Sequence, residues 1–129
     1  MGGLLLIDYG YTQGKMKNTL QAVSNHKFAN ILKDIGNADI THNINFNLFK
    51  KFTEQVIGLK SNLTTQKKFL LKMGIKQRAE MLSKNQNFLK KADIFYRLNR
   101  LIDEKQMGNL FKVMFIKNKE DNFKLGFKN

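Results

Sequence analysis

The chain opens on an apolar run that stops abruptly. Leu4 through Ile7 are all aliphatic, and Asp8, Tyr9 and Gly10 follow them directly. A short continuous apolar segment is typical of a strand covered on both faces in a parallel sheet. Open α/β sheets place their ligands at the carboxyl edge of such strands, which makes Asp8 and Tyr9 candidate site residues. Residues of these three types are also common in turns, so the motif alone leaves open the alternative that residues 8–10 form a turn after the strand.

The sequence contains no cysteine among its 129 residues. It can therefore form no disulfide framework, no thiolate zinc site and no cysteine nucleophile, which fits a reducing compartment. Its first residues lack the pattern of a signal peptide, and no apolar run approaches the roughly 20 residues that span a bilayer. We expect a soluble protein with no membrane partner. No linker or repeat marks a domain boundary within residues 1–129.

The chain is strongly basic, with 23 Lys and Arg against 10 Asp and Glu and a formal net charge of +13. Such a charge attracts anionic partners, and nucleic acid is the first to consider. The lysines are nevertheless scattered singly or in pairs through almost every segment and form no long basic stripe. A bias toward Lys, Asn, Ile and Phe is also what an AT-rich genome produces. Nucleic-acid binding is therefore not the favoured function.

The first half of the chain predicts a strand, a loop and a helix. Residues 19–23 alternate weakly, which indicates one arm of a hairpin. Residues 25–37 mix apolar and polar positions and close on Gly36 and Asn37, which predicts a turn or a single helical segment. Residues 45–56 have helical periodicity, with Asn45 as the N-cap and Gly58 placed to end the helix.

The second half predicts a strand over residues 57–63, helices, and a strand over residues 110–116 before a charged tail. Thr64 or Thr65 caps a helical stretch that reaches Leu82 and breaks near Gly74. Apolar residues at intervals of three and four predict a further helix to about Asp103, packed along its apolar stripe. That stripe is Phe88, Ala92, Phe95, Leu98 and Ile102, with Arg97 and Arg100 on a solvated face.

Many short motifs occur in an order that carries a family resemblance. They are Leu6 to Gly10, Thr19 to Val23, His26-Lys27, Ala38 to Thr41, Thr65-Gln66, Phe69-Leu70, Met73 to Ile75, Arg78 and Met107 to Val113. Their order and spacing resemble the C-terminal portion of the MidA-like S-adenosylmethionine-dependent methyltransferases. The family includes an arginine methyltransferase that assists assembly of mitochondrial complex I. The resemblance covers nearly the whole chain.

The resemblance implies an α/β fold, namely the C-terminal part of a Rossmann-like methyltransferase sheet that is incomplete without an N-terminal half. Residues 1–129 would be a partial methyltransferase domain, with residues 4–7 as its fifth strand and the last two strands as an antiparallel pair. S-adenosylmethionine would be the cofactor. Its glycine-rich turn and acidic residue belong to earlier strands of such folds, so we expect no cofactor-binding residue in this chain.

The sequence departs from the family pattern in several loops. Relatives often have proline near residues 30–32 and 35–36 and before residues 63–66, whereas this chain has no proline. Bacterial relatives often carry a histidine and an aspartate where this chain has Asn43 and Asn45. The resemblance therefore assigns no histidine role to His42.

The candidate residues suit a guanidinium substrate, although none is assigned as catalytic. Asp8 could accept hydrogen bonds from a substrate arginine in bidentate geometry, and Tyr9 could wall the pocket by stacking. Asp39 and Thr41 form a second polar pair expected near the cleft, and capping of a helix or turn explains them equally well. His26 is interpreted as structural. The two histidines lack a surrounding carboxylate set, so no metal site is expected.

Two functions remain open. The first is the substrate-side portion of a protein arginine methyltransferase linked to respiratory complex I assembly, with a protein substrate such as a complex I subunit. Its N-terminal half would be supplied as a separate polypeptide, in the bacterial cytoplasm or the mitochondrial matrix. The alternative is a non-catalytic or vestigial split-gene product with a basic surface for weak nucleic-acid or protein contact. Without the N-terminal half, residues 4–7 would have an unpaired, apolar edge prone to association, which is a feature that discriminates between the two.

Overall fold

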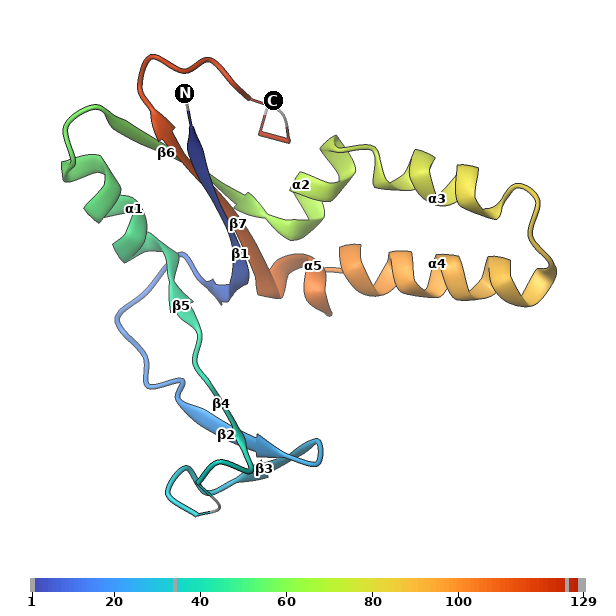
Figure 1. The fold of residues 1–129 in the computed structure, drawn as a ribbon, viewed down its shortest axis with the longest axis horizontal. Helices are drawn as coiled ribbons and strands as arrows, with labels where there is room; N and C mark the ends of the chain where they lie inside the picture. Colours follow the sequence, from blue (N-terminus) through green and yellow to red (C-terminus); the bar gives the residue numbers. More distant parts are fainter. Residues whose placement is uncertain (1, 34, 125, 128–129) are drawn as a thin grey trace.

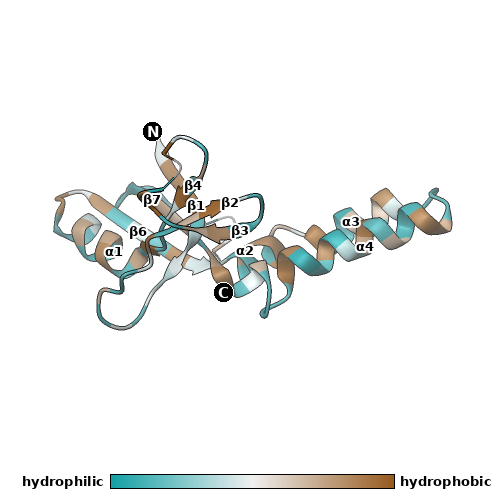
Figure 2. Cartoon of the chain, turned by 90° about the horizontal axis from the view of Figure 1, so that it is seen from below, coloured by the Kyte–Doolittle hydropathy of each residue, from teal (hydrophilic) through white to brown (hydrophobic). Residues whose placement is uncertain are grey.

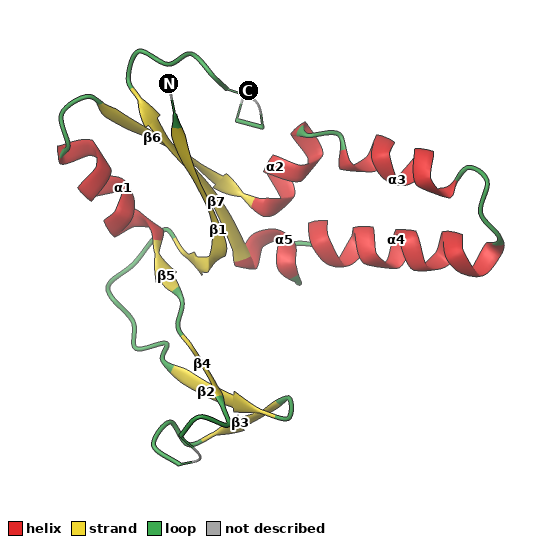
Figure 3. Cartoon of the chain, in the orientation of Figure 1, coloured by secondary structure: helices red, strands yellow, loops and turns green. Residues whose placement is uncertain are grey.

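The computed structural model describes residues 2–33, 35–124 and 126–127 as a mixed α/β fold (Figures 1 and 3). Its strands are β1 (Gly3–Tyr11), β2 (Gln21–Ser24), β3 (Lys27–Ala29), β4 (Asp39–Thr41), β5 (Ile44–Asn45), β6 (Leu59–Thr65) and β7 (Phe111–Asn118). Its helices are α1 (Phe46–Gln55), α2 (Gln66–Lys72), α3 (Ile75–Ser83), α4 (Phe88–Ile102) and α5 (Met107–Leu110). None of the helices in this described part of the chain has the length and apolar character needed to cross a membrane.

The larger sheet has four strands in the order β5-β1-β7-β6. β7 is antiparallel to both β1 and β6, which confirms that the last two strands form an antiparallel pair. The predicted strand at residues 4–7 is also confirmed, but β1 runs on to Tyr11. Asp8 and Tyr9 lie inside it because β7 offers backbone partners at Lys112 and Phe111. The interpretation of residues 8–10 as a turn is therefore wrong.

β1 has one long free edge. Its only parallel partner is β5, which pairs with Gly10 and Tyr11, and no other described strand pairs with that edge. Leu4, Leu5 and Ile7 are 54%, 46% and 49% exposed. The prediction of a strand covered on both faces is thus wrong for this chain, because too few elements flank it. The expectation of an unpaired, apolar edge is confirmed.

Helices lie on both sides of the larger sheet, with α1 on one side and α2 and α5 on the other (Figure 1). The fully buried Met114 and Val113 are neighbours on β7, so they point to opposite faces and anchor both layers. The predicted helix over residues 45–56 is confirmed: the Asn45 side chain accepts a hydrogen bond from the Leu48 N–H at 3.1 Å. Gly58 follows the helix with φ of 86°.

The smaller sheet has the order β3-β2-β4 and stands apart from the larger one (Figure 1). β2 confirms the predicted hairpin arm, shifted to begin at Gln21. The alternative of a helix over residues 25–37 is wrong, since β3 lies there and residue 34 is outside the described part. Asn25 and His26 form the connecting two-residue turn, with φ of 50° and 62°. These positive angles match the right-handed twist of a hairpin and agree with the structural interpretation of His26.

α3 and α4 form a helical hairpin that projects from the larger sheet (Figures 1 and 2). Thr65 caps α2 by accepting a hydrogen bond from the Lys68 N–H at 3.3 Å, and Gly74, with φ of 80°, separates α2 from α3 as predicted. The predicted strands both shift: β6 begins at Leu59 and β7 at Phe111, because Leu110 ends the short helix α5.

The predicted packing stripe of α4 is only partly correct. Leu98 is buried, but Phe88 and Phe95 are 83% and 40% exposed. α4 contacts α2, α3 and α5, and its less exposed residues Ile94, Leu98 and Leu101 share one side of the helix. Phe88 and Phe95 lie away from that side, so their burial would require an element that the described part of the chain does not supply.

Candidate functional site at the carboxyl end of β1

Gly10 allows β5 to approach β1 closely at the carboxyl end of β1. A Cβ atom at this position would lie 2.2 Å from the Ile44 carbonyl oxygen and 3.0 Å from Cδ2 of Phe46. No other residue type fits without moving the backbone of β5. The close approach brings the segment after β1 and the segment before α1 together at one edge of the sheet.

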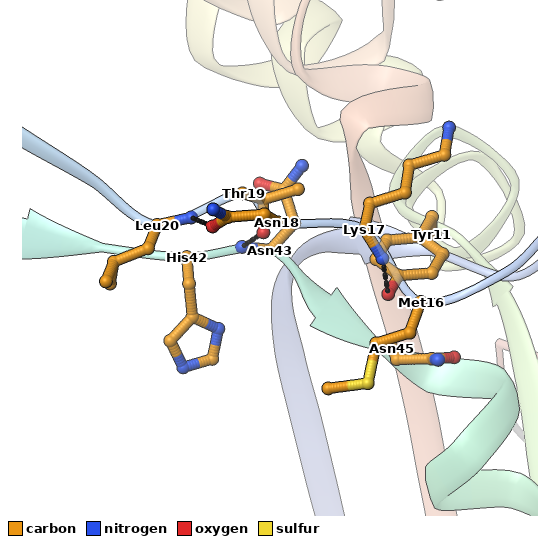
Figure 4. Close-up of a pocket in the computed structure, with 9 residues that line it drawn as sticks. All are labelled: Tyr11, Met16, Lys17, Asn18, Thr19, Leu20, His42, Asn43 and Asn45. Carbon is orange, nitrogen blue, oxygen red and sulfur yellow. Dashed lines mark hydrogen bonds between the residues drawn. The ribbon is translucent and has the colours of Figure 1, made fainter.

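Those two segments line an open hollow of about 580 Å³. Its lining residues are Tyr11, Met16, Lys17, Asn18, Thr19, Leu20, His42, Asn43 and Asn45 (Figure 4). Hydrogen bonds from backbone N–H groups to side chains hold its walls: the Asn43 N–H donates to Thr19 Oγ1 at 2.9 Å, and the Lys17 N–H donates to the Tyr11 hydroxyl at 3.3 Å. The side chains of Lys17 and His42 point away from each other (Figure 4), so they form no acid–base pair.

Asp8 and Tyr9 precede this hollow on β1 without lining it. Asp8 is half-buried, and its Oδ1 accepts a hydrogen bond from the Tyr9 N–H at 2.7 Å. The Tyr9 ring meets Phe111 edge to face, with centroids 5.6 Å apart. Successive strand residues point to opposite faces, so the Asp8 carboxylate and the Tyr9 ring lie on different sides of the sheet.

Lys112 is the residue directly opposite Asp8 in the sheet. Its ammonium donates to the Asn109 carbonyl, and burial lowers the pKa of Lys112. Among the described residues, Asp8 forms no ion pair. Its carboxylate therefore keeps oxygens free to accept hydrogen bonds from a ligand.

Asp39 and Thr41 lie on β4 in the smaller sheet, and the structure does not bring them together with Asp8 and Tyr9. Thr41 Oγ1 accepts a hydrogen bond from Gln21 Nε2 at 3.2 Å, and Asp39 is exposed. Both residues are in a strand, so the alternative that they cap a helix is wrong. Through its backbone, Thr41 leads directly to His42, which lines the hollow.

Sequence reasoning missed most of the residues that line the hollow. Tyr11, Lys17, Asn43 and His42 belong to segments whose approach depends on the β1–β5 pairing, and no local motif marks them. The sequence offered one signal for them. Tyr11 follows the candidate pair Asp8 and Tyr9 closely, and His42 and Asn43 follow Asp39 and Thr41. In the described ranges, no group of three or more Asp, Glu and His side chains is arranged to hold a metal ion.

A family model described as "Putative S-adenosyl-L-methionine-dependent methyltransferase" matches residues 1–65, which include β1, the hollow and α1. The chain belongs to this MidA-like methyltransferase family. The mitochondrial protein arginine methyltransferase NDUFAF7 of Danio rerio is 30% identical over 118 residues, covering 91% of this chain and 27% of that protein. The Xenopus tropicalis NDUFAF7 is 30% identical over 112 residues, covering 86% of this chain and 26% of that protein.

Solved structures agree with this membership. A COG1565 superfamily member from Burkholderia thailandensis, bound to S-adenosyl-homocysteine, superposes with a TM-score of 0.78 at 27% identity. The match covers 99% of this chain and 35% of that chain. A native crystal structure of a COG1565 superfamily protein from the same organism gives a TM-score of 0.76, also at 27% identity, and covers 98% and 35% of the two chains. The chain thus corresponds to a partial domain, about a quarter of the length of its curated relatives.

The family implies S-adenosylmethionine, but the described residues do not fit a complete site for it. A nucleotide cofactor is usually held by a glycine-rich turn between a strand and a helix. Here β5 passes directly into α1 and β6 directly into α2, with no glycine at either junction. Gly2 and Gly3 precede or begin a strand instead.

Proposed function

We propose that this chain is the substrate-side portion of a protein arginine methyltransferase whose cofactor-binding portion lies outside residues 1–129. One observation carries the proposal: the family match over residues 1–65 includes β1, which bears the half-buried Asp8 carboxylate and leads at Tyr11 into the hollow. The 30% identity to curated arginine methyltransferases supports the choice of substrate. By analogy with those relatives, the substrate would be a protein, with a complex I subunit as one candidate.

The proposed architecture is a Rossmann-like sheet that continues beyond β1. The free edge of β1 would pair with strands of the cofactor-binding portion, and β7 would lie between β1 and β6 as the antiparallel strand that closes the sheet. Pairing would cover Leu4, Leu5 and Ile7, whose exposure is costly in an isolated chain.

Within this arrangement, the chain would bind and orient the substrate. A guanidinium is planar and remains protonated at any physiological pH, so a carboxylate is its natural partner. Asp8 would accept its N–H groups and fix the plane of the guanidinium. Tyr9 and Tyr11 lie on the opposite face of β1 from Asp8, so they would not wall the approach to its carboxylate. Asp39 and Thr41 would contact the substrate chain further out. Positioning is the main contribution that such residues make to group transfer.

A chimera tests this proposal. The chain replaces the corresponding segment of the Burkholderia thailandensis relative, and binding of S-adenosyl-homocysteine is measured by calorimetry beside methylation of arginine-containing peptides. We expect binding and methylation by the chimera but no measurable binding by residues 1–129 alone. Micromolar binding by the isolated chain would contradict the assignment of the cofactor site to the other portion.

The Asp8→Asn variant of the chimera tests the role of the carboxylate. We expect at least about a tenfold loss of methylation, the size of one charge-assisted hydrogen bond, with little change in cofactor affinity. Asp93→Asn on the exposed hairpin is the matched control. Equal losses of methylation and cofactor affinity would argue against a substrate-side role for Asp8.

A non-catalytic product is the second candidate function. It is favoured by the lack of a glycine-rich turn at either strand–helix junction described above. A folded chimera that binds S-adenosyl-homocysteine but methylates no arginine peptide would favour it over the first.

A further inference from the structure

α4 carries a second apolar face that nothing in the described chain covers. Its members, which we call the outer face, are Phe88, Leu89, Ala92, Phe95 and Tyr96. They recur at intervals of three, four and seven, so they line one side of the helix. Phe88, Leu89 and Tyr96 are 83%, 77% and 68% exposed. The less exposed Ile94, Leu98 and Leu101 line a different side.

A contiguous stripe of this kind differs from scattered exposed apolar residues. Single exposed leucines are normal, whereas a row of aromatic and aliphatic side chains on one element marks an interaction surface. The stripe is also flanked by charge, because Lys91 and Arg100 fall on its two borders in a helical projection and are exposed. The arrangement is that of an interface with an apolar centre and a polar rim.

The comparison with the solved relative shows how much of such a protein this chain represents. That structure matches 99% of this chain, hairpin included, yet the match is only 35% of its own length. The larger part of that solved chain thus lies outside the match and is available to contact the region that corresponds to this chain. Contacts of α5 with both α4 and β1 place the base of the hairpin next to the strand whose edge is free.

A second copy of the chain fits the outer face poorly. Between Ile75 and Ile102 the only acidic residues are Glu80 and Asp93, and Asp93 already pairs with Arg97 at 2.9 Å. Two such hairpins would bring like charges together. An occupant with acidic groups around an apolar centre would instead complement Lys91 and Arg100.

We infer that the outer face of α4 docks on the part of the methyltransferase domain that lies outside residues 1–129. The inference rests on the proposed function, since it assumes that such a part joins this chain. It adds a second contact, separate from the β1 edge, through which the projecting hairpin would hold the other part of the domain. The docking surface on the other part would be apolar at its centre and acidic at its rim.

Cysteine labelling tests the inference directly, because this chain contains no cysteine of its own. Leu89→Cys on the outer face and Lys90→Cys on the solvated side are each placed in the chimera, whose other part is made free of cysteine. Maleimide labelling is followed in the folded monomer fraction. We expect labelling at position 89 to be at least about tenfold slower than at position 90, as for a group exposed only by local opening.

Equal labelling rates at the two positions would overturn the inference. If position 89 is labelled slowly in the isolated chain as well, and more slowly as the protein concentration rises, a second copy covers the outer face. That result would also overturn the inference. Failure of the chimera to bind S-adenosyl-homocysteine would count against the proposed function alone, since the labelling rates still report whether the outer face is covered.

A pair of charge-altering variants gives a second measurement. Leu89→Glu with Tyr96→Glu and the single change Lys90→Glu alter the net charge equally. We expect the double variant to lower the melting temperature of the chimera and to leave that of the isolated chain unchanged, while Lys90→Glu affects neither. An unchanged melting temperature of the chimera in the double variant would contradict docking through this face.

Discussion

At the scale of single residues, the candidate site depends on one position without a side chain. Gly10 is buried, and a Cβ added there would lie only 2.2 Å from the Ile44 carbonyl oxygen, which leaves no room for a methyl group. The contact that it permits joins β1 to β5 and thereby places Tyr11 next to Asn45. A residue that takes no part in chemistry thus shapes the hollow.

Gly10→Ala should therefore destabilise the chain. We expect a loss of about 1–3 kcal/mol in the free energy of unfolding, the usual cost of overpacking a filled site, measured by urea denaturation. Gly2→Ala is the control, because a Cβ at Gly2 would meet nothing within 4 Å. Equal stability of the two variants would mean that β5 moves away from β1 at little cost.

At the scale of elements, a salt bridge ties α2 to the loop before α5. Lys67 Nζ lies 2.7 Å from Glu104 Oε1, and its hydrogen bond and charge lower the pKa of Glu104. The Glu104 side chain is 59% exposed and that of Lys67 is 33% exposed, so solvent screens the bridge and its contribution to stability is small. It is nevertheless a local reporter of whether α2 and α5 are docked.

The pH dependence of this bridge has a definite sign. Because the folded state lowers the pKa of Glu104, the bridge contributes stability above the unfolded pKa, and that contribution is lost as pH falls through the folded pKa. Lys67→Met should raise the pKa of Glu104 toward its ordinary value in an NMR titration, with Lys72→Met as the control. An unchanged Glu104 pKa in Lys67→Met would show that the bridge does not form in solution.

At the scale of the whole molecule, apolar surface is poorly covered. The buried apolar residues of the described chain are Ala22, Phe46, Ala79, Leu98, Val113 and Met114. Large exposed apolar side chains occur on β1, α1 and α4 alike. Such a distribution is typical of a domain cut through its core, and it agrees with the partial coverage of the solved relatives.

The free edge of β1 should make the isolated chain self-associate. We expect a concentration-dependent increase in sedimentation coefficient, which Ile7→Lys reduces because a charge on an edge strand opposes pairing with another chain. Ile57→Lys is the control, since Ile57 is 97% exposed in a turn. A monomeric wild-type chain at all concentrations would contradict the prediction.

Sequence alone determined the helix starts and breaks that depend on residues only a few positions apart. Asn45 and Thr65 mark helix starts because their side chains accept hydrogen bonds three residues on, and Gly74 breaks a helix because it adopts positive φ. The family motifs likewise required only residue order, and the family model confirms the membership that they indicate.

The tertiary structure decided what depends on partners distant in the chain. Pairing with β7 keeps Asp8 and Tyr9 within β1, and pairing of β1 with β5 brings the walls of the hollow together. Asp39 and Thr41 lie in a separate sheet. Phe88 and Phe95 are exposed, which the periodicity of the sequence could not show. Periodicity identifies the apolar face of a single helix, whereas the burial of that face depends on the elements packed beside it. Sequence pattern determines local conformation, while exposure and the meeting of side chains follow from contacts that only the folded chain defines.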